Sequence, residues 1–154
     1  MEIKQIYDKK QKREISTNIL GALPDWFGIP EATQMYINES SNLPFFLAVD
    51  ESKVLGLISI KENNQYTAEI YVMGVLPNYH RQGIGRALFS RALSWSKEHE
   101  YEFLQVKTLD ASDPDVNYAA TRKFYQSVGF KPLECLPELW GKENPCLIMI
   151  QHIV

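Results

Sequence analysis

The pattern of apolar and polar positions along the chain predicts seven strands separated by four helices. Short apolar or alternating runs bounded by turn residues predict the strands, at Glu2–Tyr7, Phe45–Val49, Val54–Lys61, Tyr66–Val75, Phe103–Thr108, Lys131–Leu136 and Pro145–Ile153. The run Asp50-Glu51-Ser52 between the second and third of these indicates a hairpin. The order of elements is β-α-α-β-β-β-α-β-α-β-β, which implies an α/β (mixed α+β) fold with helices on both faces of a mixed sheet.

Capping residues and apolar spacing place the four helices. The first, Asp8 to Leu20, is mostly polar and is expected on the surface, and the second begins at Pro30 and reaches about Glu39. The third has apolar residues at helical spacing, namely Ile84, Leu88, Ala92 and Trp95. For the fourth we expect Asp113 as the cap, Pro114 at the first position, Gly129 at the stop, and a core stripe of Val116, Ala120, Phe124 and Val128.

The segment that joins the fourth predicted strand to the third helix carries the strongest chemical signal. It reads Val75-Leu76-Pro77-Asn78-Tyr79-His80-Arg81-Gln82-Gly83-Ile84-Gly85-Arg86-Ala87-Leu88. The first turn of a helix has free N–H groups and partial positive charge, and two glycines let a ligand approach that backbone closely. Arg81 and Arg86 add fixed positive charge, so the segment predicts a phosphate or diphosphate site.

Two common phosphate-binding loops do not fit this segment. A Walker loop needs Gly-Lys-Ser/Thr, whereas Gly85 is followed by Arg86-Ala87. A dinucleotide-binding turn needs a third glycine where Leu88 stands and an acidic residue at the end of the next strand, where Lys107 stands.

The run from Arg81 to Leu88 resembles the acetyl-CoA loop of the GCN5-related N-acetyltransferases (GNAT), whose pattern is Gln/Arg-x-x-Gly-x-Gly/Ala. His80 departs from it at the position of Gln or Arg. The order of elements is also similar to this family over nearly the whole chain, which implies a single domain, 1–154, with a largely antiparallel sheet of about seven strands. The resemblance implies that acetyl-CoA binds at Met73, Gly74, Val75, Arg81, Gln82, Gly83, Ile84, Gly85 and Arg86.

A second stretch, Thr121 to Phe130, is similar to the family's Tyr-x-x-x-Gly-Phe signature. Tyr125 matches the residue that in many members donates a proton to the departing thiolate, although an ordinary core tyrosine fits the same pattern. The family has an asparagine seven residues earlier, where this chain has Tyr118, and Asn117 lies one position before it. Asn117 is therefore a candidate contact for the pantetheine arm.

Glu69 is the candidate general base. Strand alternation is expected to place it on one face with Thr67, Tyr71, Met73 and Val75, and a carboxylate among apolar residues needs a partner or water. The resemblance puts it at the position of the catalytic glutamate in the histone-acetylating branch. A cross-strand salt bridge is the competing interpretation.

Aromatic residues in or near irregular segments are candidates for the acceptor site. Trp26, Phe27, Tyr36 and Trp140 have this placement, and they can equally anchor long loops to the core. By the family resemblance, the first two helices and the loop between the last two strands shape the acceptor site, which favours Trp26, Phe27 and Trp140.

Composition narrows the class of protein. Hydrophobic residues are 45% and charged residues 23% of the chain, and the net charge of −3 without a basic stripe makes nucleic acid an unexpected partner. No apolar run approaches the ~20 residues that cross a bilayer, and the N-terminus lacks the features of a signal peptide, so no membrane partner and a cytoplasmic location are expected. The two cysteines are expected as buried thiols, and the scattered histidines and aspartates predict no metal site.

These features together predict an N-acetyltransferase that moves an acetyl group from acetyl-CoA to a primary amine of a small molecule or peptide by direct attack. The alternative is a non-catalytic acyl-CoA sensor or interaction module on the same fold. The sequence leaves the acceptor open, and it allows a monomer or a homodimer.

Overall fold

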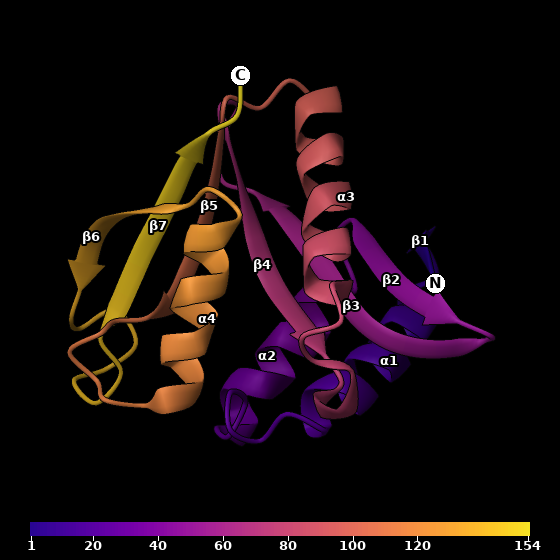
Figure 1. Cartoon of the computed structure of the whole chain (residues 1–154), viewed down its shortest axis with the longest axis horizontal. Coiled ribbons are helices and arrows are strands. Elements are labelled where there is room, and N and C mark those ends of the chain that lie inside the picture. The colour runs from indigo at the N-terminus through magenta and orange to yellow at the C-terminus, as the bar shows by residue number, and fades with distance from the viewer.

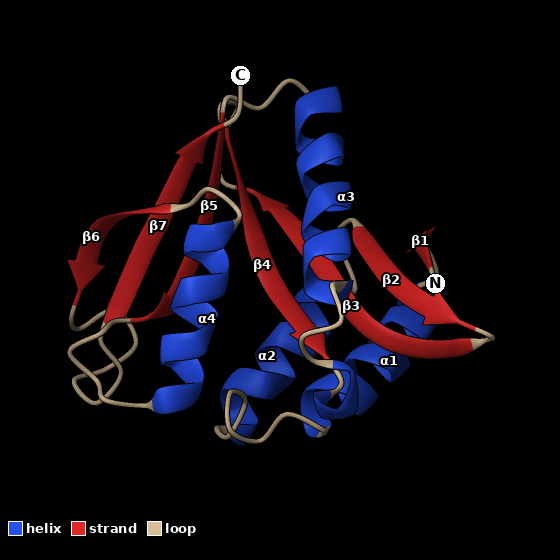
Figure 2. Cartoon of the chain, in the orientation of Figure 1, coloured by secondary structure: helices blue, strands red, loops and turns tan.

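The computed structural model describes all residues, 1–154, and contains the seven strands and four helices that the sequence predicts (Figures 1 and 2). The strands are β1 (Glu2–Ile6), β2 (Phe45–Asp50), β3 (Lys53–Glu62), β4 (Thr67–Val75), β5 (Phe103–Leu109), β6 (Lys131–Leu136) and β7 (Cys146–His152). The helices are α1 (Lys9–Gly21), α2 (Pro30–Ser40), α3 (Ile84–Glu98) and α4 (Val116–Ser127), with a short 3-10 turn, η1 (Pro77–Tyr79), before α3.

All seven strands form one sheet in the order β1-β2-β3-β4-β5-β7-β6. Only β4 and β5 pair in parallel, so the predicted mixed, largely antiparallel sheet is confirmed. Helices α3 and α4 lie in front of the sheet in Figure 1, and α1 and α2 lie behind it. The larger core packs under α3, while a smaller core packs between the sheet and α1 and α2.

Strands β4 and β5 pair over only part of their length. Thr67–Ile70 pairs with Phe103–Val106, after which β4 continues to Val75 and β5 to Leu109 without pairing to each other. The two strands diverge beyond this point, as Figure 2 shows. The centre of the sheet therefore contains an open backbone edge.

A β-bulge at Tyr71 changes which face each β4 residue occupies. Ile70 pairs with Ile60 and Val72 pairs with Ser59, so Tyr71 is an extra residue. Tyr71 and Val72 belong to the core beside α1 and α2, whereas Met73 and Val75 pack on the core under α3. The predicted single face shared by Glu69, Tyr71, Met73 and Val75 is wrong, because the bulge interrupts strict alternation.

Helix α4 begins two residues later than the predicted cap implies. Asp115 is the cap, and its carboxylate accepts hydrogen bonds from the N–H groups of Asn117 and Tyr118 at 2.8 and 3.0 Å. Asp113 instead accepts from the N–H of Asp115 at 3.0 Å, which forms a turn ahead of the helix. Val116 is exposed rather than in a core stripe, because α4 turns its Asn117–Ala120–Phe124 side toward a cleft.

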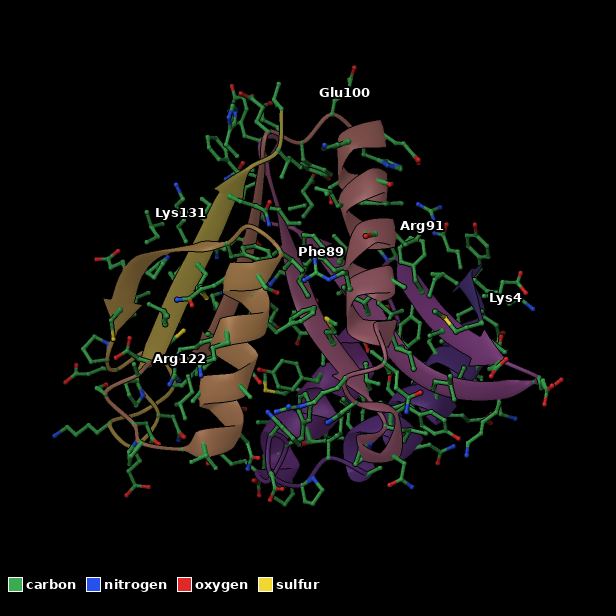
Figure 3. All side chains as sticks on the ribbon, in the orientation of Figure 1. Lys4, Phe89, Arg91, Glu100, Arg122 and Lys131 are labelled. Atoms are coloured by element: carbon green, nitrogen blue, oxygen red, sulfur yellow. The ribbon has the colours of Figure 1, made fainter.

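Long-range contacts hold α4 in place despite its small buried surface. Arg122, labelled in Figure 3, donates to the Leu109 carbonyl oxygen at 2.6 Å, which fixes α4 to the end of β5. On the facing helix, Phe89 packs edge-on against Phe130, with 5.7 Å between ring centroids. Arg122 thus anchors α4 to β5, and the Phe89–Phe130 contact joins α3 to the segment that follows α4.

Edge position explains one further difference from expectation. Cys146 on the inner strand β7 is buried as expected, but Cys135 is exposed because β6 is the last strand of the sheet. None of the helices has the length and apolar character that a membrane crossing requires.

The close approach of β3 to β4 makes Gly56 a position that tolerates no side chain. A Cβ at Gly56 would lie 2.8 Å from the Gly74 carbonyl oxygen, which is backbone and cannot move independently. We expect Gly56→Ala to lower the free energy of unfolding by about 1–3 kcal/mol, as overpacking of a core does. Urea denaturation measures the change.

Gly21→Ala is the matched control for that substitution. A Cβ at Gly21 meets nothing within 4 Å, and the residue ends α1, so stability should stay the same or rise slightly. Equal stability of Gly56→Ala and the wild type would contradict the predicted clash.

Candidate active site

A cleft of about 650 Å³ opens where β4 and β5 diverge. Residues of β4, β5, α4, the α1–α2 connection and the segment before α3 line it. Most of the residues singled out from the sequence lie on this lining, namely Trp26, Phe27, Met73, Gly74, Val75, Arg81, Gly83, Gly85, Arg86, Asn117, Tyr125 and Trp140. The structure therefore brings together segments that are up to about a hundred residues apart in the chain.

The N-terminus of α3 presents a row of free backbone N–H groups to the cleft. The five N–H groups from Gln82 to Arg86 donate to no backbone acceptor, and the first helical bond is Ala87 N–H to Gly83 O at 3.0 Å. Arg81 and Gly83 both have left-handed backbone, with φ of 62° and 82°. Such a turn at a helix N-terminus points successive donors at one place, which is the geometry that binds a phosphate group.

Cationic side chains surround this row of donors. Arg81, Arg86 and Lys123 line the cleft, and Arg86 Nη2 donates to Ser127 Oγ at 3.2 Å across the gap between α3 and α4. Ile84 is only 4% exposed and anchors the helix end in the core. Gln82 is exposed, its side-chain amide donates to the Asn78 carbonyl at 3.2 Å, and it is not part of the lining.

The free edge of β4 continues from this anion site into the cleft. Leu76 N–H donates to Leu55 O at 2.9 Å, so Gly74 and Val72 also direct their backbone groups toward β3. The backbone groups of Met73 and Val75 point the other way, into the opening. His80 Nε2 lies 2.7 Å from the Val75 carbonyl oxygen, so one of these edge groups has a partner from the chain itself.

The α1–α2 connection is tied to α4 by two hydrogen bonds at Trp26. Trp26 Nε1 donates to Thr121 Oγ1 at 3.0 Å, and Tyr118 Oη donates to the Trp26 carbonyl at 2.7 Å. The Trp26 ring also meets the His80 ring edge-on at 5.7 Å. Segments from both sides of the opening are thus joined at one end of the cleft.

Tyr125 lies on the lining between the anion site and this connection. Its ring packs edge-on against Phe124 and Phe130, with centroids 5.7 and 5.6 Å away. Burial raises the pKa of the Tyr125 phenol above its usual value, with smaller contributions from Tyr118 and Tyr36. The phenol therefore stays protonated near neutral pH and can donate a hydrogen bond or a proton.

Glu69 is buried, with 4% of its surface exposed, and it does not line the cleft. Asn63 Nδ2 and Gln105 Nε2 each donate to its Oε1 at 2.9 Å, and Lys107 Nζ lies 3.2 Å from both carboxylate oxygens. Lys107 is the member of this ion pair that reaches the cleft. The carboxylate is satisfied by its own partners and has no direct contact with the cavity.

Several polar or aromatic lining residues were not identified as site residues from the sequence, among them Tyr71, Lys107 and Tyr118. Tyr71 enters the cleft because of the β4 bulge, and Lys107 and Tyr118 follow no recognisable motif. Tyr36, proposed as an aromatic near a loop, lies in α2 and packs on Tyr71 with 5.3 Å between ring centroids. Burial raises the pKa of Tyr36, and that of Tyr71 to about 12.

Acidic, histidine and cysteine side chains do not gather into groups of three or more that could hold a metal ion.

Comparison with known proteins identifies the family. The profile of the acetyltransferase (GNAT) family matches residues 12–130, which include the free edge of β4, the α3 N-terminus and Tyr125. This chain belongs to the acetyltransferase (GNAT) family. The match covers both segments that carry the sequence signatures.

Individual relatives are similar over parts or all of the chain. Streptothricin acetyltransferase A of Bacillus subtilis (strain 168) is 28% identical over 89 residues, which are 58% of this chain and 51% of that protein, so the chain spans about half the length of this relative. Two solved structures share the fold. Ard1 from Thermoplasma volcanium has a TM-score of 0.78 at 18% identity over 100% of this chain and 99% of that one. An aminoglycoside 6′-N-acetyltransferase complexed with coenzyme A has a TM-score of 0.74 at 17% identity over 100% and 98%.

The donors at the α3 N-terminus generate a binding prediction. Gly85→Glu would place a carboxylate among the five N–H groups, where it competes with a bound anion and repels it. We expect coenzyme A affinity to fall by about tenfold or more, since each charge-assisted hydrogen bond is worth about 1.5–3 kcal/mol. Isothermal titration calorimetry measures the affinity.

Gly21→Glu serves as the control because it adds the same charge at a position outside the cleft with open space around it. Its coenzyme A affinity should equal that of the wild type. Unchanged affinity in Gly85→Glu, with the melting temperature preserved, would show that the anion site lies elsewhere.

Proposed function

We propose that this chain transfers an acetyl group from acetyl-CoA to the nitrogen of a primary amine. The observation that carries the proposal is the row of free N–H groups from Gln82 to Arg86 beside the unpaired edge of β4. Free N–H groups at a helix N-terminus bind a diphosphate. An unpaired strand edge binds an amide-containing arm that pairs with it like an added strand. Membership of the acetyltransferase (GNAT) family and the coenzyme A bound in the aminoglycoside 6′-N-acetyltransferase structure support the same choice.

The residues present fit such a ligand along the whole cleft. The N–H groups between Arg81 and Arg86 hold the diphosphate, and the Met73 and Val75 backbone groups bind the pantetheine amides. His80 Nε2, 2.7 Å from the Val75 carbonyl oxygen, leaves the second lone pair of that oxygen for the arm. Asn117, on the α4 side of the cleft, contributes a side-chain amide to the arm. Bound acetyl-CoA supplies the acetyl group as a reactive thioester.

Tyr125 acts as the proton donor to the leaving sulfur. Its residue lines the cleft, and its phenol is protonated at neutral pH as an ordinary tyrosine is, because the tyrosine pKa is about 10. The N–H groups near Val75 stabilise negative charge on the carbonyl oxygen during attack. Alignment of amine and thioester in the cleft contributes ~7–11 kcal/mol, and a positioned acid contributes about 10²–10⁴-fold.

Glu69 removes the proton from the acceptor ammonium through water rather than by direct contact. The lining contains no carboxylate, and Lys107 Nζ holds both Glu69 oxygens at 3.2 Å. The neutral amine then attacks the thioester carbonyl directly and the carbon–sulfur bond breaks. The sulfur takes the Tyr125 proton, and the proton that the nitrogen loses as the amide forms returns to the Tyr125 phenolate.

The first test of this proposal is release of thiol from acetyl-CoA in the presence of primary amines. We expect turnover by the wild type, and in Tyr125→Phe a kcat lower by about 10²-fold with little change in acetyl-CoA affinity, because only proton donation is lost. Binding without thiol release for any amine would favour the non-catalytic sensor. Equal losses in kcat and affinity in Tyr125→Phe would assign the residue a packing role.

The second test addresses Glu69 through pH dependence. We expect Glu69→Gln to lower kcat/KM near pH 7 by about tenfold or more, because a general base is lost. The loss should shrink as the pH rises toward the amine pKa of about 10, where the acceptor is already neutral. Initial rates from pH 6.5 to 10 measure the ratio of variant to wild type.

Asn63→Ala is the control for Glu69→Gln. It removes one donor at 2.9 Å from Glu69 but keeps the carboxylate, so its ratio to wild type should not depend on pH. If the ratio of kcat/KM for Glu69→Gln to that of the wild type is constant across pH, Glu69 is not the base. Its role would then be the ion pair with Lys107.

A further inference from the structure

The cleft divides into two parts with different chemistry. One part, at α3 and α4, holds Arg81, Arg86, Lys123 and the free N–H groups. The other part lies on the side of α1 and α2, where partly buried aromatic side chains pack on the smaller core. Because the proposed function assigns the first part to acetyl-CoA, the second part is where the acceptor enters.

Aromatic side chains form most of this acceptor side. Tyr36 packs against Tyr71 with ring centroids 5.3 Å apart and planes at 60°, and Phe27 meets Tyr36 edge-on at 5.8 Å. Trp26 is fixed by its two hydrogen bonds to α4, and Trp140 on the β6–β7 loop is 36% exposed. These rings present flat apolar surface in fixed orientations, which suits a flat apolar ligand.

No carboxylate lines this side of the cleft. Of all the residues that line the cleft none is Asp or Glu, and Lys107 is one of the cations among them. Lys61, which lies outside the lining, places its Nζ 5.7 Å from the Tyr71 ring centroid. After burial, the carboxylates that help to raise the pKa of Tyr71 are Glu39, which is exposed on α2, and Glu69, which is bound to Lys107.

A ligand with several ammonium groups would therefore lose water without gaining carboxylate partners. Each additional ammonium would be desolvated in a cleft whose lining offers Lys107 and no carboxylate, a costly arrangement that selects against such a ligand. A ligand with a single amine has only one ammonium to desolvate, and the proposed reaction removes that charge. The third N–H of Lys107, beyond the two that meet Glu69, remains for a carbonyl or hydroxyl oxygen of the acceptor.

We propose that the acceptor is a monoamine carried on a planar aromatic body, held between the Tyr36–Tyr71 pair and Trp26, and that polycationic amines are excluded. This proposal rests on the proposed function. This acceptor class differs from streptothricin and aminoglycosides, which appear in the names of two of the similar proteins.

The test compares tyramine and tryptamine with kanamycin and spermidine as acceptors, measured by thiol release from acetyl-CoA. We expect kcat/KM for the aromatic monoamines to exceed that for the polycations by about tenfold or more. Higher kcat/KM for kanamycin or spermidine would overturn the acceptor assignment and leave the acetyltransferase proposal intact. If calorimetry shows acetyl-CoA binding but none of the amines causes thiol release, the proposed function and this inference are both overturned.

Variants at Tyr36 test the site itself. Tyr36→Leu keeps an apolar side chain on α2 but removes the ring that meets Tyr71, so KM for tyramine should rise while acetyl-CoA affinity stays the same. Tyr66→Leu is the control, because Tyr66 is exposed and lies outside the cleft. An unchanged KM for tyramine in Tyr36→Leu, at an unchanged melting temperature, would contradict the aromatic binding site.

Discussion

The parallel pairing of β4 with β5 ends at Ile70 and Val106, and the rest of the site depends on this interruption. A backbone edge inside a sheet normally pairs with a neighbouring strand, because unpaired N–H and C=O groups away from water cost free energy. Here the edge borders a cleft of about 650 Å³ instead. The unpaired groups are what allow an extended, amide-containing ligand to bind as an additional strand.

Contacts made by the chain itself maintain this opening. Arg122 bonds the end of β5, beyond the point where its pairing with β4 stops, and Arg86 reaches from α3 to Ser127 on α4. At the other end, Trp26 joins the α1–α2 connection to α4 through Thr121. The cleft is therefore bounded by fixed elements on each side, which favours a preformed site in which little binding free energy is spent on ordering.

Two substitutions relative to the family pattern have a local structural consequence. His80 stands where Gln or Arg is usual, and its ring lies 2.7 Å from the Val75 carbonyl and packs on Trp26. Tyr118 stands where asparagine is usual, and its hydroxyl donates to the Trp26 carbonyl. Both departures meet at Trp26, so they act together on the position of the α1–α2 connection rather than on the anion site.

The order and type of the elements and the glycine-opened start of α3 were determined by the sequence, because apolar period, turn residues and helix ends are local properties. Tertiary structure alone decided which β4 residues share a face, since the bulge at Tyr71 follows from its pairing with β3. It also decided that Glu69 is bound to Lys107 and removed from the cleft, and that Tyr36 meets Tyr71 there. These are contacts between segments distant in sequence, and no local pattern encodes which side chains such segments bring together.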